Sequence, residues 1–99
     1  MFAVIRETSY DPENPIHETP EFREFQLEHA NLEGYQGTVV VEVEPGRFVT
    51  VTLWHTAEHM RAARGAMETV VERTISPLMA SPAKLIGTGP VVVNDLATG

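Results

Sequence analysis

Cysteine is absent from this chain of 99 residues, and its absence excludes disulfides, thiolate metal ligands and cysteine nucleophiles together. Long apolar runs are also missing, because no hydrophobic stretch approaches the roughly 18 residues of a membrane-spanning helix. The first residues, MFAVIR, contain no basic segment, long apolar segment or cleavage site of the kind that marks a secretory leader. We therefore expect a cytoplasmic protein without a membrane segment.

Basic residues are scarce, with 7 Lys+Arg against 14 Asp+Glu and a formal net charge of -7. This charge repels phosphate backbones and anionic lipid surfaces, and no local basic cluster reverses it, which argues against nucleic-acid and membrane binding. The composition, 42% hydrophobic and 21% charged, is that of a folded globule, so residues 1–99 are predicted to form a single domain. A domain of this size has a modest core, which a partner subunit would enlarge.

The first third of the chain predicts a strand and a helix. Residues 2–10 mix β-branched and aromatic side chains, as strands do, and a loop with two prolines follows them. Thr19 and Pro20 then mark the start of a helix that Gly34 ends. The apolar face of this helix repeats at helical spacing: Phe22, Phe25, His29 and Leu32.

The rest of the chain predicts three more strands and a second helix. Residues 36–44 and 47–55 read as a hairpin around a Pro-Gly turn, and Thr56 caps a helix that Ser76-Pro77 ends. The last strand is expected within residues 84–93, where Pro90 lacks an N–H and so favours a sheet edge. The order β-α-β-β-α-β predicts a ferredoxin-like α+β fold, with two helices on one face of a four-stranded antiparallel sheet.

Both faces of the predicted hairpin are apolar. An even-numbered turn places Val39, Val41 and Val43 on the face of Trp54. The other face then carries Val40, Val49, Val51 and Leu53. Because two helices cover only one face of a sheet, we expect a homodimer in which two sheets meet face to face, with residues 91–93 available for exchange. The alternative is a monomer with one weakly apolar, solvated face.

The run from residue 34 to residue 63 carries a family resemblance. It reads GYQG, a strand, a turn, FVTVTLW and then TAEHMRAA. This pattern resembles the antibiotic biosynthesis monooxygenase family of the dimeric α/β-barrel superfamily. The resemblance implies a homodimeric barrel with a pocket between sheet and helices in each subunit. It also implies, as in some members, oxygen chemistry on hydroxyaromatics or quinols without flavin or metal.

A related heme-degrading branch also has the strand-end tryptophan. That branch further uses an asparagine in the first strand and a histidine about ten residues past the tryptophan. Here the first strand contains no asparagine, and position 64 is Arg64. The sequence therefore argues against heme degradation, and no cofactor is expected.

Trp54 is the main candidate for substrate binding, because a tryptophan at a strand end beside a helix start can wall a small-molecule pocket or pack the barrel end. His29, Tyr35 and His55 are the candidate proton-transfer residues. His29 on an apolar stripe is more often a hydrogen-bonded structural histidine, and Tyr35 can simply pack at a strand entrance. Arg6, inside the first strand, would either face a carboxylate at a dimer interface, which we favour, or hold a substrate anion in a pocket.

The segment from His55 to His59 matches the pattern HxxEH of inverted zinc peptidases. That chemistry needs both histidines on one continuous helix. Here His55 closes a strand and Thr56 caps the next helix, so we expect the histidines to diverge and no zinc to bind.

Three functional readings remain open from the sequence. The chain is a cofactor-independent monooxygenase acting on a small hydroxyaromatic or quinol, a non-catalytic binding protein for a small aromatic or apolar metabolite, or a structural dimeric domain whose interior is filled by its own side chains.

Overall fold

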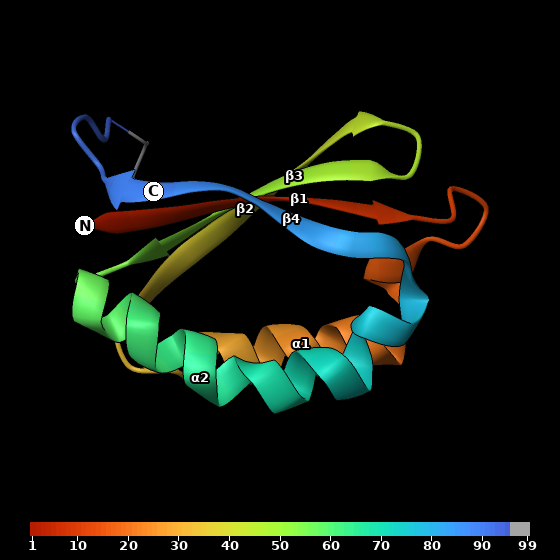
Figure 1. Ribbon diagram of the computed structural model, residues 1–99, viewed down its shortest axis with the longest axis horizontal. Helices are drawn as coiled ribbons and strands as arrows, with labels where there is room; N and C mark the ends of the chain where they lie inside the picture. Colours follow the sequence, from red (N-terminus) through yellow and green to blue (C-terminus); the bar gives the residue numbers. More distant parts are fainter. Residues whose placement is uncertain (96–99) are drawn as a thin grey trace.

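The computed structural model describes residues 1–95 and has the predicted element order (Figure 1). The strands are β1 (Phe2–Tyr10), β2 (Tyr35–Glu44), β3 (Arg47–Trp54) and β4 (Met79–Pro90). The α-helices are α1 (Pro20–Ala30) and α2 (Ala57–Thr74), and short 3-10 helices cover Ile16–Glu18 and Ser76–Leu78. The strands form one antiparallel sheet in the order β2-β3-β1-β4, with both helices on one face. The ferredoxin-like α+β prediction is confirmed.

Both helices begin at the predicted threonines. The Thr19 hydroxyl accepts the Phe22 N–H at 3.2 Å, and the Thr56 hydroxyl accepts the His59 N–H at 3.1 Å. Each bond satisfies one N–H that a first helical turn leaves unpaired. The caps fix the residue at which each helix begins.

Strand β4 begins five residues earlier than predicted and ends at Pro90. Its first residues, MASPA, contain no β-branched side chain, so their strand conformation was not evident from composition. The pairing with β1 shifts register three times along this strand, and β4 lies at the sheet edge. An edge position tolerates Pro82 and Pro90, because one side of the strand needs no N–H donors.

The predicted assignment of the β2 valines to the two sheet faces is wrong by one residue. Val40 pairs with Thr50 and Val41 with Val49, and the register shifts between Glu42 and Glu44. Val43 is therefore the extra residue of a β-bulge, which exchanges the two faces of the strand beyond it. Such a bulge needs no glycine, so the sequence pattern did not reveal it.

The helix-facing side of the sheet contains two separate hydrophobic clusters. One is centred on Tyr10, Ile16, Phe22, Phe48 and Ile75. The other is centred on Val4, Trp54 and Ala63 at the opposite end of the strands. The core is therefore divided, and the space between the clusters is where the cavity described below lies.

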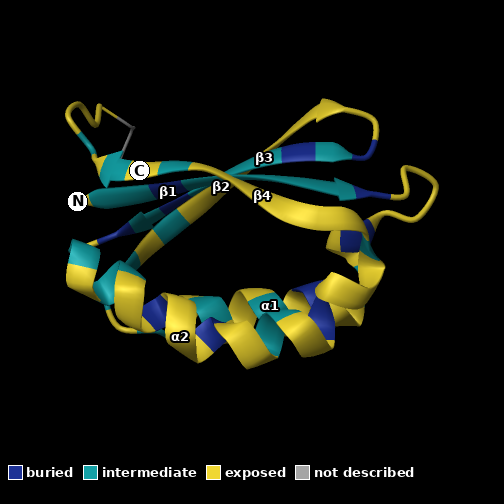
Figure 2. Cartoon of the chain, in the orientation of Figure 1, coloured by how far each residue is buried: buried dark blue, intermediate teal, exposed yellow. Residues whose placement is uncertain are grey.

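The outer face of the sheet, opposite the helices, is apolar and uncovered in the single chain. Its centre is the row Val39, Val51 and Ile5 across three neighbouring strands. Val39 is 51% exposed, and the edge strands β2 and β4 are exposed along most of their length (Figure 2). Large apolar patches on soluble domains commonly mark contact surfaces.

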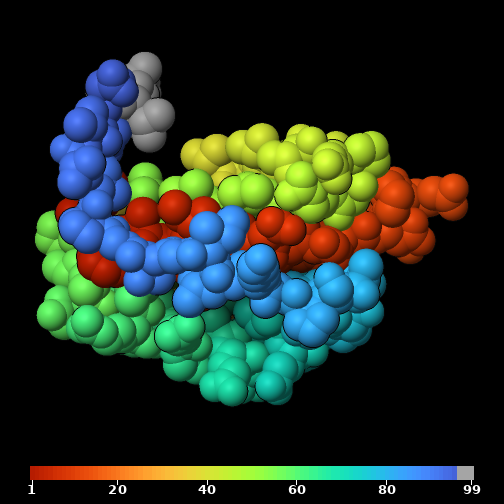
Figure 3. Space-filling view, turned by 45° about the horizontal axis from the view of Figure 1, so that its top comes forward, coloured from red at the N-terminus to blue at the C-terminus, as the bar shows by residue number. Residues whose placement is uncertain are grey.

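Residues 91–95, which follow β4, project from the body of the domain (Figure 3), on the outer side of the sheet (Figure 1). Val91 N–H still bonds the Met1 carbonyl at 2.9 Å, but Val92 and Val93 are 89% and 77% exposed. Within residues 1–95, no helix combines the length and hydrophobicity that crossing a bilayer requires.

Gly34 joins α1 to β2 in a left-handed backbone conformation, which residues other than glycine adopt only at a cost in free energy. Its φ is +84°, and an added Cβ would overlap the His59 side chain. We expect Gly34→Ala to lower the free energy of unfolding by about 2–4 kcal/mol, since the left-handed backbone alone costs roughly 1–2 kcal/mol. Urea unfolding measures this loss.

The matched control is Gly65→Ala in α2, where nothing lies within 4 Å of the added Cβ. This change should raise stability by about 0.5–1 kcal/mol, because alanine is the better helix former. Equal stability of the two variants would contradict the geometry of the turn at Gly34.

Candidate ligand cavity

The helix-facing side of the two central strands has large side chains at its ends and polar ones in its middle. On β1 the residues are Val4, Arg6, Thr8 and Tyr10, and on β3 they are Phe48, Thr50, Thr52 and Trp54. The polar middle is not closed by the helices above it. A cavity of about 800 Å³ lies there between sheet and helices. This volume is in the range of small-molecule sites, so the interior is not filled by the chain's own side chains.

One end of the cavity is an aromatic wall. The Trp54 ring lies 5.3 Å from the His29 ring and 5.6 Å from the Tyr35 ring, centre to centre, and Trp54 is 3% exposed. These three residues come from β3, α1 and β2, and all line the cavity. The structure thus brings together three of the five residues selected from the sequence.

The Tyr35 hydroxyl is held by a short polar chain. It donates to the Thr38 hydroxyl at 2.9 Å, which in turn lies 3.4 Å from the Thr52 hydroxyl. These hydrogen bonds hold the phenol ring against Trp54 and engage the Tyr35 hydroxyl as a donor to Thr38. Tyr35 is therefore better placed to shape the cavity than to exchange protons in it.

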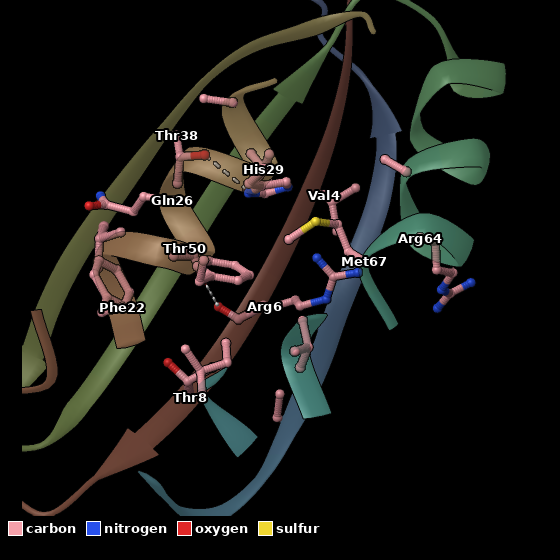
Figure 4. A pocket seen from close by; sticks show the side chains of 18 of the residues that line it. Val4, Arg6, Thr8, Phe22, Gln26, His29, Thr38, Thr50, Arg64 and Met67 are labelled. Carbon is pink, nitrogen blue, oxygen red and sulfur yellow. Dashed lines mark hydrogen bonds between the residues drawn. The ribbon is translucent and has the colours of Figure 1, made fainter. Parts of the chain in front are cut away.

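His29 lies at the same wall (Figure 4). Burial, together with the nearby positive charge of Arg6, lowers the pKa of His29 from 6.5 to about 4. The His29 ring forms no hydrogen bond with residues 1–95, and its role as a structural histidine or as a base stays a prediction. The ring instead contacts Phe25, Tyr35 and Trp54 and faces the cavity.

Arg6 lies in the middle of the cavity floor and extends from β1 toward Met67 of α2 (Figure 4). The favoured prediction, a place in the interface between two sheets, is wrong, since β1 turns Arg6 toward the helices. No carboxylate within residues 1–95 forms an ion pair with it. Burial, and secondarily the charge of Arg64, lowers the pKa of Arg6.

His55 lies outside the cavity and is exposed. A strand ends before it and a helix starts after it, as predicted, yet its ring is 5.9 Å from that of His59. The expectation that the two side chains diverge is therefore wrong. Nδ1 of His59 instead lies 2.9 Å from the Thr56 hydroxyl, and its Nε2 is 3.6 Å from Glu33. Residues 1–95 contain no group of three His, Asp or Glu side chains arranged to hold a metal.

Arg64 of α2 also lines the cavity, and the sequence reasoning did not select it. A signal was available, because Arg64 lies one helical turn after Met60 and one turn before Met67, inside an otherwise apolar stripe. A charged residue in such a stripe often faces a solvent-filled space or a ligand.

Comparisons with known proteins give structural matches alone. No known protein family matches the sequence, and no curated protein matches it. A candidate antibiotic biosynthesis monooxygenase from Nitrosomonas europaea superposes with a TM-score of 0.70 at 19% identity, covering 92% of this chain and 90% of that one. A candidate antibiotic biosynthesis monooxygenase from Caulobacter crescentus gives 0.73 at 14% identity, with coverage of 93% and 90%.

A variant of SnoaB, a cofactor-independent oxygenase from Streptomyces nogalater, matches with a TM-score of 0.70 at 12% identity and covers 94% of each chain. These identities are low, so the likeness shows the fold. The chain has the fold of the antibiotic biosynthesis monooxygenase structures, as the sequence resemblance implied.

Proposed function

We propose that this protein is a cofactor-independent monooxygenase acting on a small hydroxyaromatic or quinol. The observation that carries the proposal is the cavity itself, with an aromatic wall at Trp54 and a neutral imidazole, His29, beside it. The fold of the neighbouring structures, one of which is named as a cofactor-independent oxygenase, supports the same reading.

The proposed reaction uses few protein groups. The substrate ring lies against Trp54, and His29 accepts a proton from the substrate hydroxyl, which leaves an electron-rich anion. This anion reduces dioxygen within the cavity between the sheet and the helices. The substrate supplies the four electrons that reduce dioxygen. One atom of dioxygen replaces two hydrogens of the substrate as a new carbonyl oxygen, and the other atom leaves as water. No external reductant is consumed.

A binding protein for an aromatic metabolite is the second candidate. The observation that favours it is the pKa of His29, about 4, which makes the free imidazole a weak base toward a phenolic hydroxyl. Binding alone needs only the apolar cavity wall.

We further propose that two copies pair through their outer sheet faces. The row of exposed Val39 and half-buried Val51 and Ile5 would then be covered, and the projecting segment of residues 91–95 would lie on the partner's side of the sheet. Such an interface should bury more than roughly 1,000 Å² in total.

Oxygen uptake tests the proposed activity. Protein freed of metal and flavin should consume oxygen with at least one member of a panel of quinols and naphthols. Trp54→Ala should raise KM by about tenfold or more with a smaller effect on kcat, because the ring supplies binding surface. Trp54→Phe is the control and should recover most of the affinity.

Binding without oxygen uptake would favour the binding-protein reading. Uptake that survives Trp54→Ala with unchanged KM would place the activity elsewhere in the chain.

A further inference from the structure

The charged residues of the chain are distributed unevenly between the cavity and the rest of the surface. Three of the 7 basic residues line the cavity, namely Arg6, Arg23 and Arg64, against two of the 14 acidic ones, Glu68 and Glu72. In a chain with a net charge of -7, the cavity lining thus carries more basic than acidic residues, the reverse of the whole chain. A ligand with a negative charge is therefore attracted there and repelled from most of the remaining surface.

Arg6 is the central member of this group. It lies on the cavity floor, and no carboxylate of residues 1–95 pairs with it. Arg64, the other arginine close enough to affect it, has the same sign of charge and also lacks a partner in the described residues. Arg6 is half-buried and Arg64 is exposed, and both line the cavity without an ion-pair partner in residues 1–95. Their guanidiniums leave donors that a carboxylate can satisfy in a bidentate manner.

Arg6 lies beyond Trp54 along the strand direction, yet near enough to His29 for its charge to lower the pKa of that residue. Trp54 pairs with Phe2 of β1, and Arg6 is four residues further along that strand, which corresponds to roughly 13 Å of backbone. Val4, an apolar residue, lies between them on the same face. The cavity thus has an aromatic end, an apolar middle and a cationic part.

We propose that the ligand of this cavity is an elongated aromatic carboxylic acid. Its ring system lies against Trp54, His29 and Tyr35, and its carboxylate is bound by Arg6 with support from Arg64. This inference rests on the proposed function. It narrows the proposed substrate class from hydroxyaromatics in general to hydroxyaromatics that carry a carboxylate remote from the reacting ring position.

The binding test compares two probes that differ only in the carboxylate, a hydroxynaphthoic acid and the corresponding naphthol. Trp54 is the only tryptophan of the chain, so quenching of its fluorescence reports occupancy of the aromatic end. The hydroxynaphthoate should bind at least about tenfold more tightly than the naphthol, since hydrogen bonds to charged groups are the strong ones. The experiment needs no turnover, so its result is independent of the oxygenase reaction.

Arg6→Met should weaken hydroxynaphthoate binding by about 10–100-fold and change naphthol binding less than about twofold. Arg6→Lys, which keeps the charge but loses the fork of donors, should give an intermediate loss. Arg61→Met is the matched control, because it removes one positive charge from α2 outside the cavity, and it should leave both affinities unchanged.

The stability of the ligand-free protein separates a ligand-binding role from a structural one. If Arg6 stabilised the fold, replacing it would lower the melting temperature. Because Arg6→Met instead removes an unpaired, partly buried charge, we expect the melting temperature to rise. A lower melting temperature together with equal weakening of both probes would overturn the proposal. Equal affinity of the wild-type protein for the two probes would also overturn the proposal. A third contrary result is an absorbance spectrum that shows bound naphthol in its ionised form only when Arg6 is present. That result would mean that Arg6 binds the reacting oxygen instead of a carboxylate.

Discussion

Replacing His29 with glutamine is expected to reduce the turnover number for oxygen consumption by about 10²–10⁴-fold, the usual contribution of a general base. His29 is the one residue of the three proton-transfer candidates that faces the cavity at Trp54 with no hydrogen-bond partner in residues 1–95. The Tyr35 hydroxyl donates a hydrogen bond to Thr38, and His55 is outside the cavity. Glutamine preserves much of the side-chain volume but cannot accept the proton.

The pH dependence of kcat/KM follows from the pKa of His29. Because that pKa is lowered to about 4, the neutral base form persists at acidic pH, and kcat/KM should decline only as the pH falls toward 4. Arg6→Met removes a nearby like charge, so it should raise the pKa of His29 and move this decline to higher pH. His29 also contributes stability that is fully present above pH 6.5 and is lost as the pH falls from 6.5 toward 4, so folding must be monitored in parallel.

The matched control for His29 is His17, a second histidine that lines the cavity, at its other end. Its ring packs against Phe22 and Phe48 in the cluster remote from Trp54. His17→Gln should change turnover less than about threefold. If the two glutamine variants lose activity equally, or if Tyr35→Phe alone abolishes it, His29 is not the base.

Val51→Glu is expected to convert a dimer into a monomer. Val51 is in the central row of the outer sheet face, paired with Val39 on one side and Ile5 on the other. In a two-fold pairing of outer faces, a glutamate at this position brings two like charges into an apolar contact, which costs several kcal/mol. Light scattering should therefore give the mass of two chains for the wild-type protein and of one chain for the variant, at micromolar concentration.

Ala66→Glu is the control for this change, because Ala66 is exposed on α2 and lies outside the cavity lining. It should leave the dimer intact. The melting temperature of the wild-type protein should also rise with protein concentration, as expected when association stabilises the folded chain, and that of Val51→Glu should not. A wild-type monomer would disprove the pairing of outer faces.

The fold could be predicted because its signals are local. Thr19 and Thr56 each precede a helical apolar stripe, and the Pro-Gly turn separates two β-branched runs. The β-bulge at Val43 has no such signal, since any residue can occupy it, and a shift of one residue exchanges the faces of β2. Register therefore could not be settled by counting from the turn.

The site was predictable in part for a similar reason. Trp54, Tyr35 and His29 were found because each has an unusual type or position in its element, and the structure places them together. Arg6 was expected in an interface because the sequence does not show which face of β1 the helices cover. The cavity itself depends on the volume between two layers, which no local pattern reports.

Turnover under ¹⁸O₂ gives the most direct test of the proposed activity. Protein freed of metal and flavin is incubated with the substrate that supports oxygen uptake, and the product and the water formed are analysed by mass spectrometry. The proposed reaction predicts one labelled oxygen atom in the product and the other in water, with the rate of labelling lowered by about 10²–10⁴-fold in His29→Gln. A product without label, or label incorporation that persists unchanged in both His29→Gln and Trp54→Ala, would contradict a cofactor-independent monooxygenase at this cavity.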